Sequence, residues 1–368
     1  MNLFKVLKSR EFKLIFIILL IIIIGFVALY SAGAGDYSLL KKQGAALFIG
    51  ILVAAVVCSM DYETYLRYWY IFYGVCIIML IGVLFTEPIN NARSWFKIGE
   101  TGIAFQPSEV TKIVLIILAG KYLAEIKKIS MSSKDKFKRI CILSALLMVP
   151  IGLIMIQPDF GTAMVIVVSV LAMIFVWGID VKVIKYGILS LLVIAPVTYF
   201  FFLKPGQKER IMVFLDPSRD PSGSGYHVLQ SKLAIGSGQL TGMGLMNGIQ
   251  TQLGYLYANT TDFIFASIAE EMGFFVAAFL IVLLVLLVIT CFNIALNARD
   301  EEGKLIAIGF GMMFGFHIIV NVGMTMGLVP VTGIPLPFVS YGGSSMLTNL
   351  IAVGILLNVS FRKRGLRF

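Results

Sequence analysis

Ten runs of mainly apolar residues, each close to the length of a membrane-spanning helix, constrain this 368-residue chain more than any other feature. A helix needs about 20 such residues to cross the hydrocarbon core of a bilayer. The predicted spans cover residues 12–32, 42–60, 68–86, 107–125, 140–156, 159–178, 184–203, 263–292, 304–327 and 345–361. The sequence therefore predicts an all-α polytopic membrane protein, in which residues 1–368 form a single integral membrane domain.

The composition excludes an ordinary soluble domain. Hydrophobic residues make up 59% of the chain and charged residues 14%, whereas about a quarter of the residues of a soluble domain are charged. A net charge of +10 would suggest nucleic-acid binding in a soluble protein. Here the basic residues cluster at the ends of the spans, which membrane orientation explains better. The four cysteines all lie in apolar runs without metal-ligand spacing, so we expect buried thiols.

Lysine and arginine are concentrated on one side of the predicted membrane. They precede the first span and follow spans four, six and ten, as Lys5, Lys8, Arg10, Lys13, Lys127, Lys128, Lys134, Lys136, Lys138, Arg139, Lys182, Lys185, Arg362, Lys363, Arg364 and Arg367. Because basic loops stay in the cytoplasm, both chain ends are expected there. The unusual polar, glycine and proline residues then lie outside, mainly in residues 87–106, 204–262 and 328–344. Any active site is expected to open outward.

The large extracytoplasmic loop, residues 204–262, carries candidate ligands for a phosphorylated substrate. Arg210 and Lys232 suit phosphate or pyrophosphate, although an ordinary solvated loop would hold similar residues. A glycine-rich tract from Gly236 to Gly254 is expected to let the backbone approach a ligand closely. Asp262 ends the loop directly before an apolar helix, and spacing alone does not distinguish a catalytic carboxylate from a helix cap.

Two further motifs place polar residues at outer helix ends. Glu109 and Lys112 are three residues apart near the start of a span, so they share a helix face. They are expected to form an ion pair and to line a polar substrate cavity. Arg93 lies in the preceding loop. Asp159 belongs to the next motif, Gln157-Pro158-Asp159-Phe160-Gly161-Thr162, and is expected to be either a plain N-cap or a substrate ligand.

The last two motifs accompany the spans near the C-terminus. Glu270 and Glu271 are adjacent acids at membrane depth, so at least one is expected to face a polar interior. Residues 329–345 are rich in glycine and proline and include Ser340 and Ser344. A tightly folded segment that is buried in protein or lines a cavity is expected there. The Gly311/Gly315 and Gly323/Gly327 spacings are expected to serve close helix packing.

Together these motifs resemble those of the SEDS family (shape, elongation, division and sporulation). The resemblance rests on Ala92-Arg93-Ser94-Trp95, Gln106-Pro107-Ser108-Glu109 with Lys112, Gln157-Pro158-Asp159-Phe160-Gly161-Thr162, Asp220-Pro221 with Gly225-Tyr226, Thr261-Asp262-Phe263, Glu270-Glu271-Met272-Gly273 and residues 333–345. It covers nearly the whole chain in order. Residues 230–232 and 248–253 are more similar to the rod-shape branch of the family than to the division branch. The chain departs at Leu256-Tyr257-Ala258, where the family usually has Leu-Pro-Glu.

The resemblance implies a peptidoglycan glycosyltransferase that polymerises lipid II during cell elongation, on the outer face of the bacterial cytoplasmic membrane. The family's essential aspartate falls on Asp262, as base or as ligand of a divalent cation such as Mg²⁺ or Mn²⁺. A class B penicillin-binding protein, other elongation proteins, lipid II and the nascent glycan strand are the implied partners. For substrate binding, the candidates are Arg93, Glu109, Lys112, Asp159, Arg210, Lys232, Ser340 and Ser344.

Two rival functions fit a ten-span chain with polar residues at depth. A flippase of lipid-linked precursors should place polar groups along a path that reaches both faces, whereas the distinctive motifs here crowd the outer face. A non-catalytic scaffold of the wall-synthesis complex would leave Asp262 dispensable.

Overall fold

The structure is a computed structural model that describes residues 10–88, 92–98, 103–128, 132–178, 185, 205–220 and 223–362. Within these ranges, seven helices are long and apolar enough to cross a membrane. They are α2 (Arg10–Ala32), α3 (Tyr37–Ser59), α7 (Ser133–Ile156), α8 (Phe160–Trp177), α13 (Ile264–Leu296), α14 (Glu301–Thr325) and α15 (Gly343–Phe361). The prediction of an all-α polytopic membrane protein is confirmed.

The other three predicted spans differ from this group. The third corresponds to α5 (Trp69–Gly82) and the 3-10 turn η1 (Val83–Phe85), which follow a short helix, α4 (Tyr62–Arg67). The fourth corresponds to α6 (Pro107–Lys128), which is long enough to cross a membrane but carries several charges along its length. The seventh, predicted for residues 184–203, lies almost wholly outside the described residues.

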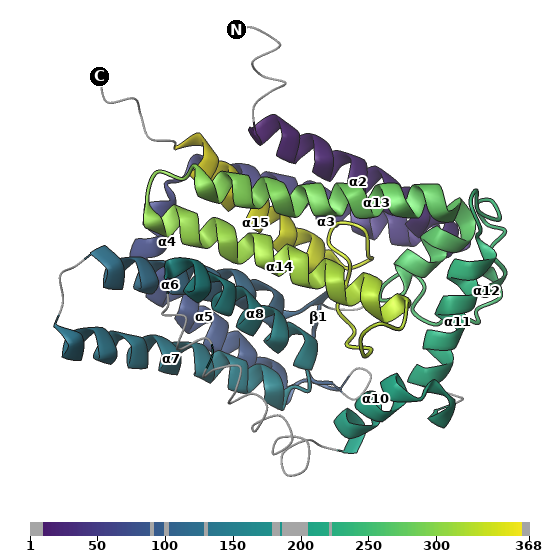
Figure 1. Cartoon of the computed structure of the whole chain (residues 1–368), viewed down its shortest axis with the longest axis horizontal. Coiled ribbons are helices and arrows are strands. Elements are labelled where there is room, and N and C mark those ends of the chain that lie inside the picture. The colour runs from purple at the N-terminus through teal and green to yellow at the C-terminus, as the bar shows by residue number, and fades with distance from the viewer. Residues whose placement is uncertain are drawn as a thin grey trace, which may run out of the picture.

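Helix α14 lies at the centre of the bundle, packed against α13, α8 and α6 (Figure 1). Its contact with α13 is close because of two glycines. A Cβ on Gly311 would lie 2.9 Å from the Phe292 ring, and one on Gly315 would lie 3.7 Å from Val288. The predicted glycine packing is therefore confirmed for this pair. Gly327, by contrast, has φ +69° and belongs to the turn after α14.

The start of α2 and the end of α15 lie at one end of the bundle, and helices α10 to α12 lie at the other (Figure 1). Side chains connect the helices at the first end. Asn358 Nδ2 of α15 donates to the carbonyls of Val57 and Cys58, each at 3.1 Å, where α3 ends. Ser360 Oγ donates to Glu11 Oε1 of α2.

The large loop is itself mostly helical. It contains α10 (Pro205–Leu215), the 3-10 turn η3 (Pro217–Arg219), α11 (Ser224–Ser237) and α12 (Ile249–Gln252). The loop before α6 contributes a two-stranded antiparallel sheet of β1 (Phe96–Ile98) and β2 (Ile103–Phe105), with Phe96 opposite Phe105.

Helix α13 is interrupted at Gly273, which has φ 78° and ψ 179°. The interruption frees backbone groups that pair with the glycine-rich tract. Phe274 N donates to Gln239 O at 2.9 Å, and Gly244 N donates to Glu271 O at 3.0 Å. The tract thus packs directly on the backbone of α13.

Candidate functional site

Asp262 lies in the turn between α12 and α13, with its side chain partly exposed. The N-cap position of α13 is Phe263, so Asp262 stands one residue before the cap. Its carboxylate faces the backbone of Gly333, where an added Cβ would lie 3.6 Å from Asp262 Oδ2. The structure therefore brings this acid against the segment rich in glycine and proline.

Three long-range hydrogen bonds hold the backbone on either side of that carboxylate. Asn321 Nδ2 of α14 donates to Asp262 O at 3.0 Å. Ser340 Oγ donates to Thr261 O at 2.7 Å, and Tyr341 N donates to Thr260 O at 2.9 Å. Because three consecutive carbonyls are each bound, the position of Asp262 is fixed by contacts with two distant parts of the chain.

Residues 329–342, called here the motif segment, are non-helical, and residues 336–340 at their centre are buried. Leu336 and Val339 are each 1% exposed. Gln43 of α3 binds the segment twice, because its Nε2 donates to Ser340 O and its Oε1 accepts from Gly342 N, each at 3.1 Å. The prediction of a tightly folded segment buried in protein is confirmed.

Two helices approach the motif segment through glycines. A Cβ on Gly25 of α2 would lie 2.9 Å from the Cα of Val339, and one on Gly161 of α8 would lie 2.7 Å from Ile334 Cγ1. Side chains at these two positions would displace the segment, and with it the carbonyls that it supports beside Asp262.

Glu109 and Lys112 form the predicted ion pair, with Lys112 Nζ 2.9 Å from Glu109 Oε1 and both side chains buried. Lys112 Nζ also lies 3.0 Å from His317 Nε2, while His317 Nδ1 lies 3.0 Å from Pro335 O. A carbonyl can only accept, so Nδ1 carries the proton and Nε2 accepts from the ammonium. This buried chain of contacts connects α6 to α14 and the motif segment. A role of the pair in substrate binding stays a prediction.

Asp159 is the N-cap of α8, with Oδ1 accepting from Thr162 N at 3.1 Å. The expected cap is confirmed, and the same carboxylate has a second task. Its Oδ2 accepts from Gln106 Nε2 at 2.8 Å and from Ser108 Oγ at 3.0 Å. Asp159 thus links the starts of α6 and α8.

Ser340 and Ser344 are buried, and each hydroxyl is engaged with protein groups. Besides its bond to Thr261 O, Ser340 Oγ accepts from Leu336 N at 2.8 Å. Ser344 Oγ donates to Ala104 O and accepts from Gln106 N, each at 3.1 Å. The structure gives both residues positioning contacts, and their predicted contact with substrate stays a prediction.

The three candidate cations lie on separate elements. Arg93 is exposed and donates to Leu84 O at 3.2 Å. Lys232 is exposed on α11, and its stem covers Gly327, where a Cβ would lie 2.3 Å from Lys232 Cε. Its neighbour Ser231 donates to Thr325 O at 2.7 Å, which holds α11 against the end of α14. Arg210 lies on α10, and its side chain is outside the described part of the structure.

Glu270 and Glu271 are 0% and 3% exposed. Glu270 accepts from the backbone N of Gln250 at 2.8 Å and of Thr251 at 3.0 Å, so it caps the start of α12. Glu271 accepts from Gln252 Nε2 at 2.7 Å. The expected polar surroundings are thus supplied by α12, in the loop that precedes Asp262.

The glycine-rich tract approaches α13 closely, and its expected approach to a ligand stays a prediction. A Cβ on Gly238 would lie 1.8 Å from Ala269 O, and one on Gly242 would lie 2.2 Å from Glu271 O. A Cβ on Gly248 would lie 2.7 Å from Glu270 Oε2. Only glycine fits at these three positions, because the backbone of the loop contacts α13 there.

His227 of α11 is enclosed by aromatic rings near Asp262. Its ring centroid lies 5.5 Å from that of Tyr257, in a stacked arrangement, and 6.3 Å from that of Phe263. Burial lowers the pKa of the His227 imidazole, against an opposing effect of Asp220. Tyr257 belongs to Leu256-Tyr257-Ala258, where the sequence differs from the family motif, and its ring packs on His227.

Gln43, His317 and Asn321 position the site and were not predicted. Each is a polar residue in an otherwise apolar span, which is itself a signal of function or of a buried partner. His317 and Asn321 are also four residues apart, so they share one face of α14.

No three His, Cys, Asp or Glu side chains in the described ranges come together in a way that could hold a metal ion. A divalent cation held by Asp262 stays a prediction.

Residues 11–365 match the sequence profile of the FtsW, RodA and SpoVE family, described as cell cycle proteins. The chain belongs to this family. It is 32% identical to the peptidoglycan glycosyltransferase MrdB of Escherichia coli, over 96% of this chain and 94% of that protein.

Solved structures agree with this membership. A chain from a peptidoglycan synthase complex, described as coordinating polymerisation and crosslinking, is 32% identical with a TM-score of 0.79 over 95% of this chain and 96% of that one. The crystal structure of the rod shape determining protein RodA of Thermus thermophilus is 29% identical with a TM-score of 0.70, over 96% and 97%. The similarity to the rod-shape branch is consistent with these relatives.

Proposed function

We propose that this chain is a peptidoglycan glycosyltransferase that polymerises lipid II, with Asp262 as its catalytic carboxylate. The observation that carries the proposal is the position of Asp262. It stands outside the cap position of α13, and its neighbouring carbonyls are held by α14 and the motif segment. The family relationship over nearly the whole chain supports the same reaction class.

The reaction joins the 4-hydroxyl of one sugar to the anomeric carbon of another. The hydroxyl oxygen forms the new bond to carbon, and the bond from that carbon to the lipid pyrophosphate breaks with its electron pair. The product is β-linked and the donor α-linked, so a single inversion is sufficient. The Asp262 carboxylate accepts the proton of the attacking hydroxyl as a general base.

Positive charge near the leaving pyrophosphate would stabilise the negative charge that develops there. Lys232, Arg210 and Arg93 are the residues that we propose for this role. Lys232 is supported by its place on α11, which is held against the end of α14. The buried Glu109–Lys112 pair and Asp159 would maintain the walls around the sugar.

A divalent cation is the second role that we propose for the same carboxylate. Mg²⁺ is commonly held by one or two carboxylates together with substrate phosphates. Asp262 would supply the carboxylate, and Mg²⁺ or Mn²⁺ would offset the charge of the pyrophosphate.

We further propose that the site faces outward and works with a class B penicillin-binding protein. Helices α10 to α12 lie at the opposite end of the bundle from the start of α2 and the end of α15 (Figure 1). The sequence is basic before and within the first turn of α2 and after α15, and basic segments favour the cytoplasm. The similarity to a chain of a synthase complex that coordinates polymerisation and crosslinking supports a crosslinking partner.

The test is a gel assay of glycan chain length with the purified full-length chain and lipid II. It should be run with and without the penicillin-binding protein, and with and without a metal chelator. Polymer is expected. Its loss on chelation would show that a divalent cation is needed, and re-addition of Mg²⁺ or Mn²⁺ alone would identify the cation. A chain that moves lipid II across vesicle membranes without forming polymer would be a flippase, and a chain with neither activity would be a scaffold. Either result would overturn the proposal.

A further inference from the structure

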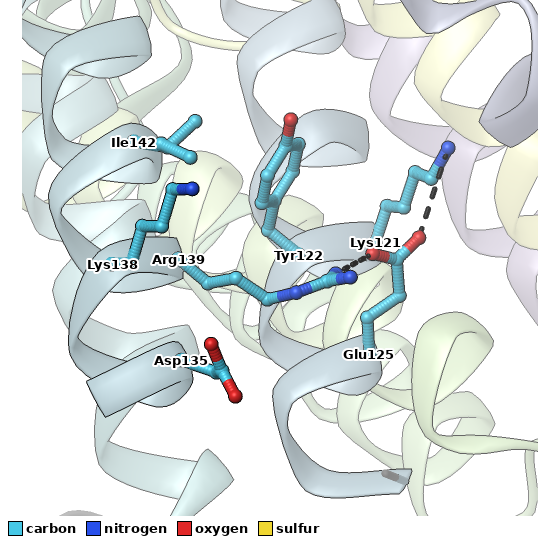
Figure 2. A pocket seen from close by; sticks show the side chains of 7 residues that line it. All are labelled: Lys121, Tyr122, Glu125, Asp135, Lys138, Arg139 and Ile142. Atoms are coloured by element: carbon cyan, nitrogen blue, oxygen red, sulfur yellow. Dashed lines mark hydrogen bonds and ion pairs between the residues drawn. The ribbon is translucent and has the colours of Figure 1, made fainter. Parts of the chain in front are cut away.

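A polar cavity lies between α6 and α7, with a volume of about 530 Å³. Its lining residues are Lys121, Tyr122, Glu125, Asp135, Lys138, Arg139 and Ile142 (Figure 2). The cavity is built from the last turns of α6 and the first turns of α7, which are rich in basic residues: Lys121, Lys127, Lys128, Lys134, Lys136, Lys138 and Arg139. It thus lies at the end of the bundle that the basic residues predict to be cytoplasmic.

The charges of this cavity leave it net positive. It contains three cations and two carboxylates, and Glu125 is already neutralised. Arg139 reaches across the cavity to Glu125 at 2.5 Å, and Lys121 Nζ lies 3.8 Å from the same carboxylate (Figure 2). The second acid, Asp135, is exposed in the first turn of α7.

Lys138 and Tyr122 supply donors that the described residues do not use. Among the described residues, no acidic group lies within ion-pair distance of Lys138 Nζ, and the Tyr122 hydroxyl has no protein acceptor. The two side chains project from facing helices on the same side of the Arg139–Glu125 bridge (Figure 2). An ammonium, a hydroxyl and the remaining N–H groups of a guanidinium are a donor set that suits a phosphate group.

The surroundings of the cavity favour a lipid as the source of that phosphate. Ile142, one turn beyond Lys138 along α7, lines the cavity and is 39% exposed. Phe137 and Ile140, on other faces of the same turns, are also exposed. A lipid whose headgroup occupied the cavity would therefore have apolar side chains beside its acyl chains, which a soluble anion or an acidic peptide does not need.

We propose that the cavity between α6 and α7 binds the phosphodiester headgroup of an anionic phospholipid from the leaflet on that side of the membrane. Lys138 is the principal ligand, and Tyr122 and Arg139 complete the donor set. Basic pockets between transmembrane helices are known to recognise such headgroups in other proteins. This inference does not depend on the reaction proposed for Asp262.

The test uses native mass spectrometry of the full-length chain in detergent, and it measures the affinity with which the chain binds one lipid molecule. Dioleoyl phosphatidylglycerol is compared with dioleoyl phosphatidylcholine for the natural sequence, Lys138→Gln and Lys138→Arg. The natural sequence is expected to prefer the anionic lipid, and Lys138→Gln to weaken its binding about five-fold, because one basic residue near an anionic lipid contributes about 1 kcal/mol. Lys138→Arg should keep the preference.

Lys136→Gln is the matched control, because Lys136 is exposed on the same helix and is absent from the cavity lining. It should change binding by less than about two-fold. Equal losses from the two glutamine variants, or no preference between the two lipids, would overturn the proposal. Displacement of the lipid by glycerophosphoglycerol or hexaglutamate at equal potency would also overturn it, in favour of a soluble anion or an acidic peptide.

Discussion

Replacing Asn321 by alanine should lower the activity of the folded protein by loosening the turn that carries Asp262. Asn321 Nδ2 donates to Asp262 O at 3.0 Å and to Ile334 O at 2.8 Å. Alanine removes both bonds and leaves two carbonyls without this donor. At about 1 kcal/mol for each bond, the loss of stability is about 2 kcal/mol. Because small displacements of catalytic groups are costly, lipid II polymerisation should fall between about 10-fold and 100-fold.

Asn358→Ala is the matched control for this prediction. Asn358 Nδ2 also donates to the carbonyls of Val57 and Cys58, each at 3.1 Å, and contacts the carbonyl of Met60. Its Oδ1, like that of Asn321, is buried without a partner among the described residues. It lies at the opposite end of the bundle, so it should lower the melting temperature by a similar amount and leave polymerisation nearly unchanged. Equal losses of activity in the two variants would refute the reasoning, because the effect would then follow from stability alone.

Three further predictions concern stability. Lys112→Met should destabilise the protein by about 3–5 kcal/mol, because it leaves Glu109 buried without its cation, and adding Glu109→Gln should recover most of this loss in a thermal melt. Gly273→Ala should melt far lower than Gly315→Ala, because its Cβ would lie 2.2 Å from Gly242 N, whereas that of Gly315 meets Val288 at 3.7 Å. The folded-state pKa of His227 is lowered. The stability that neutral His227 contributes should therefore be complete above about pH 6.5 and decrease as the pH falls below that value. Amide exchange in α11 should become faster over the same pH range, and His227→Phe should abolish this pH dependence.

Hydropathy placed the helices well because burial in lipid is a local property of the sequence. The predicted span 107–125 became α6 (Pro107–Lys128), and the predicted span 263–292 became α13 (Ile264–Leu296). The Glu109–Lys112 pair was also predictable, because residues three apart meet on one turn of a helix. The cap at Asp159 has the same local origin.

The remaining features depend on partners that are distant in the sequence. Asn321 and Asp262 are 59 residues apart, and Lys112 and His317 are 205 residues apart. The interruption of α13 at Gly273 is stabilised by backbone bonds to Gln239 and Leu240, so no pattern within the helix marks it. The glycines of residues 236–254 indicated a close approach correctly, but spacing does not say whether the approaching group is a ligand or another helix.

The central claim is that the Asp262 carboxylate performs the chemistry of glycan polymerisation. Asp262→Asn preserves the shape of the side chain and removes its ability to accept a proton. We expect polymerisation of purified lipid II to fall by at least about 100-fold, as for the loss of a general base, with an unchanged melting temperature. An Asp262→Asn protein that is folded and polymerises lipid II at close to the rate of the natural sequence would contradict the claim.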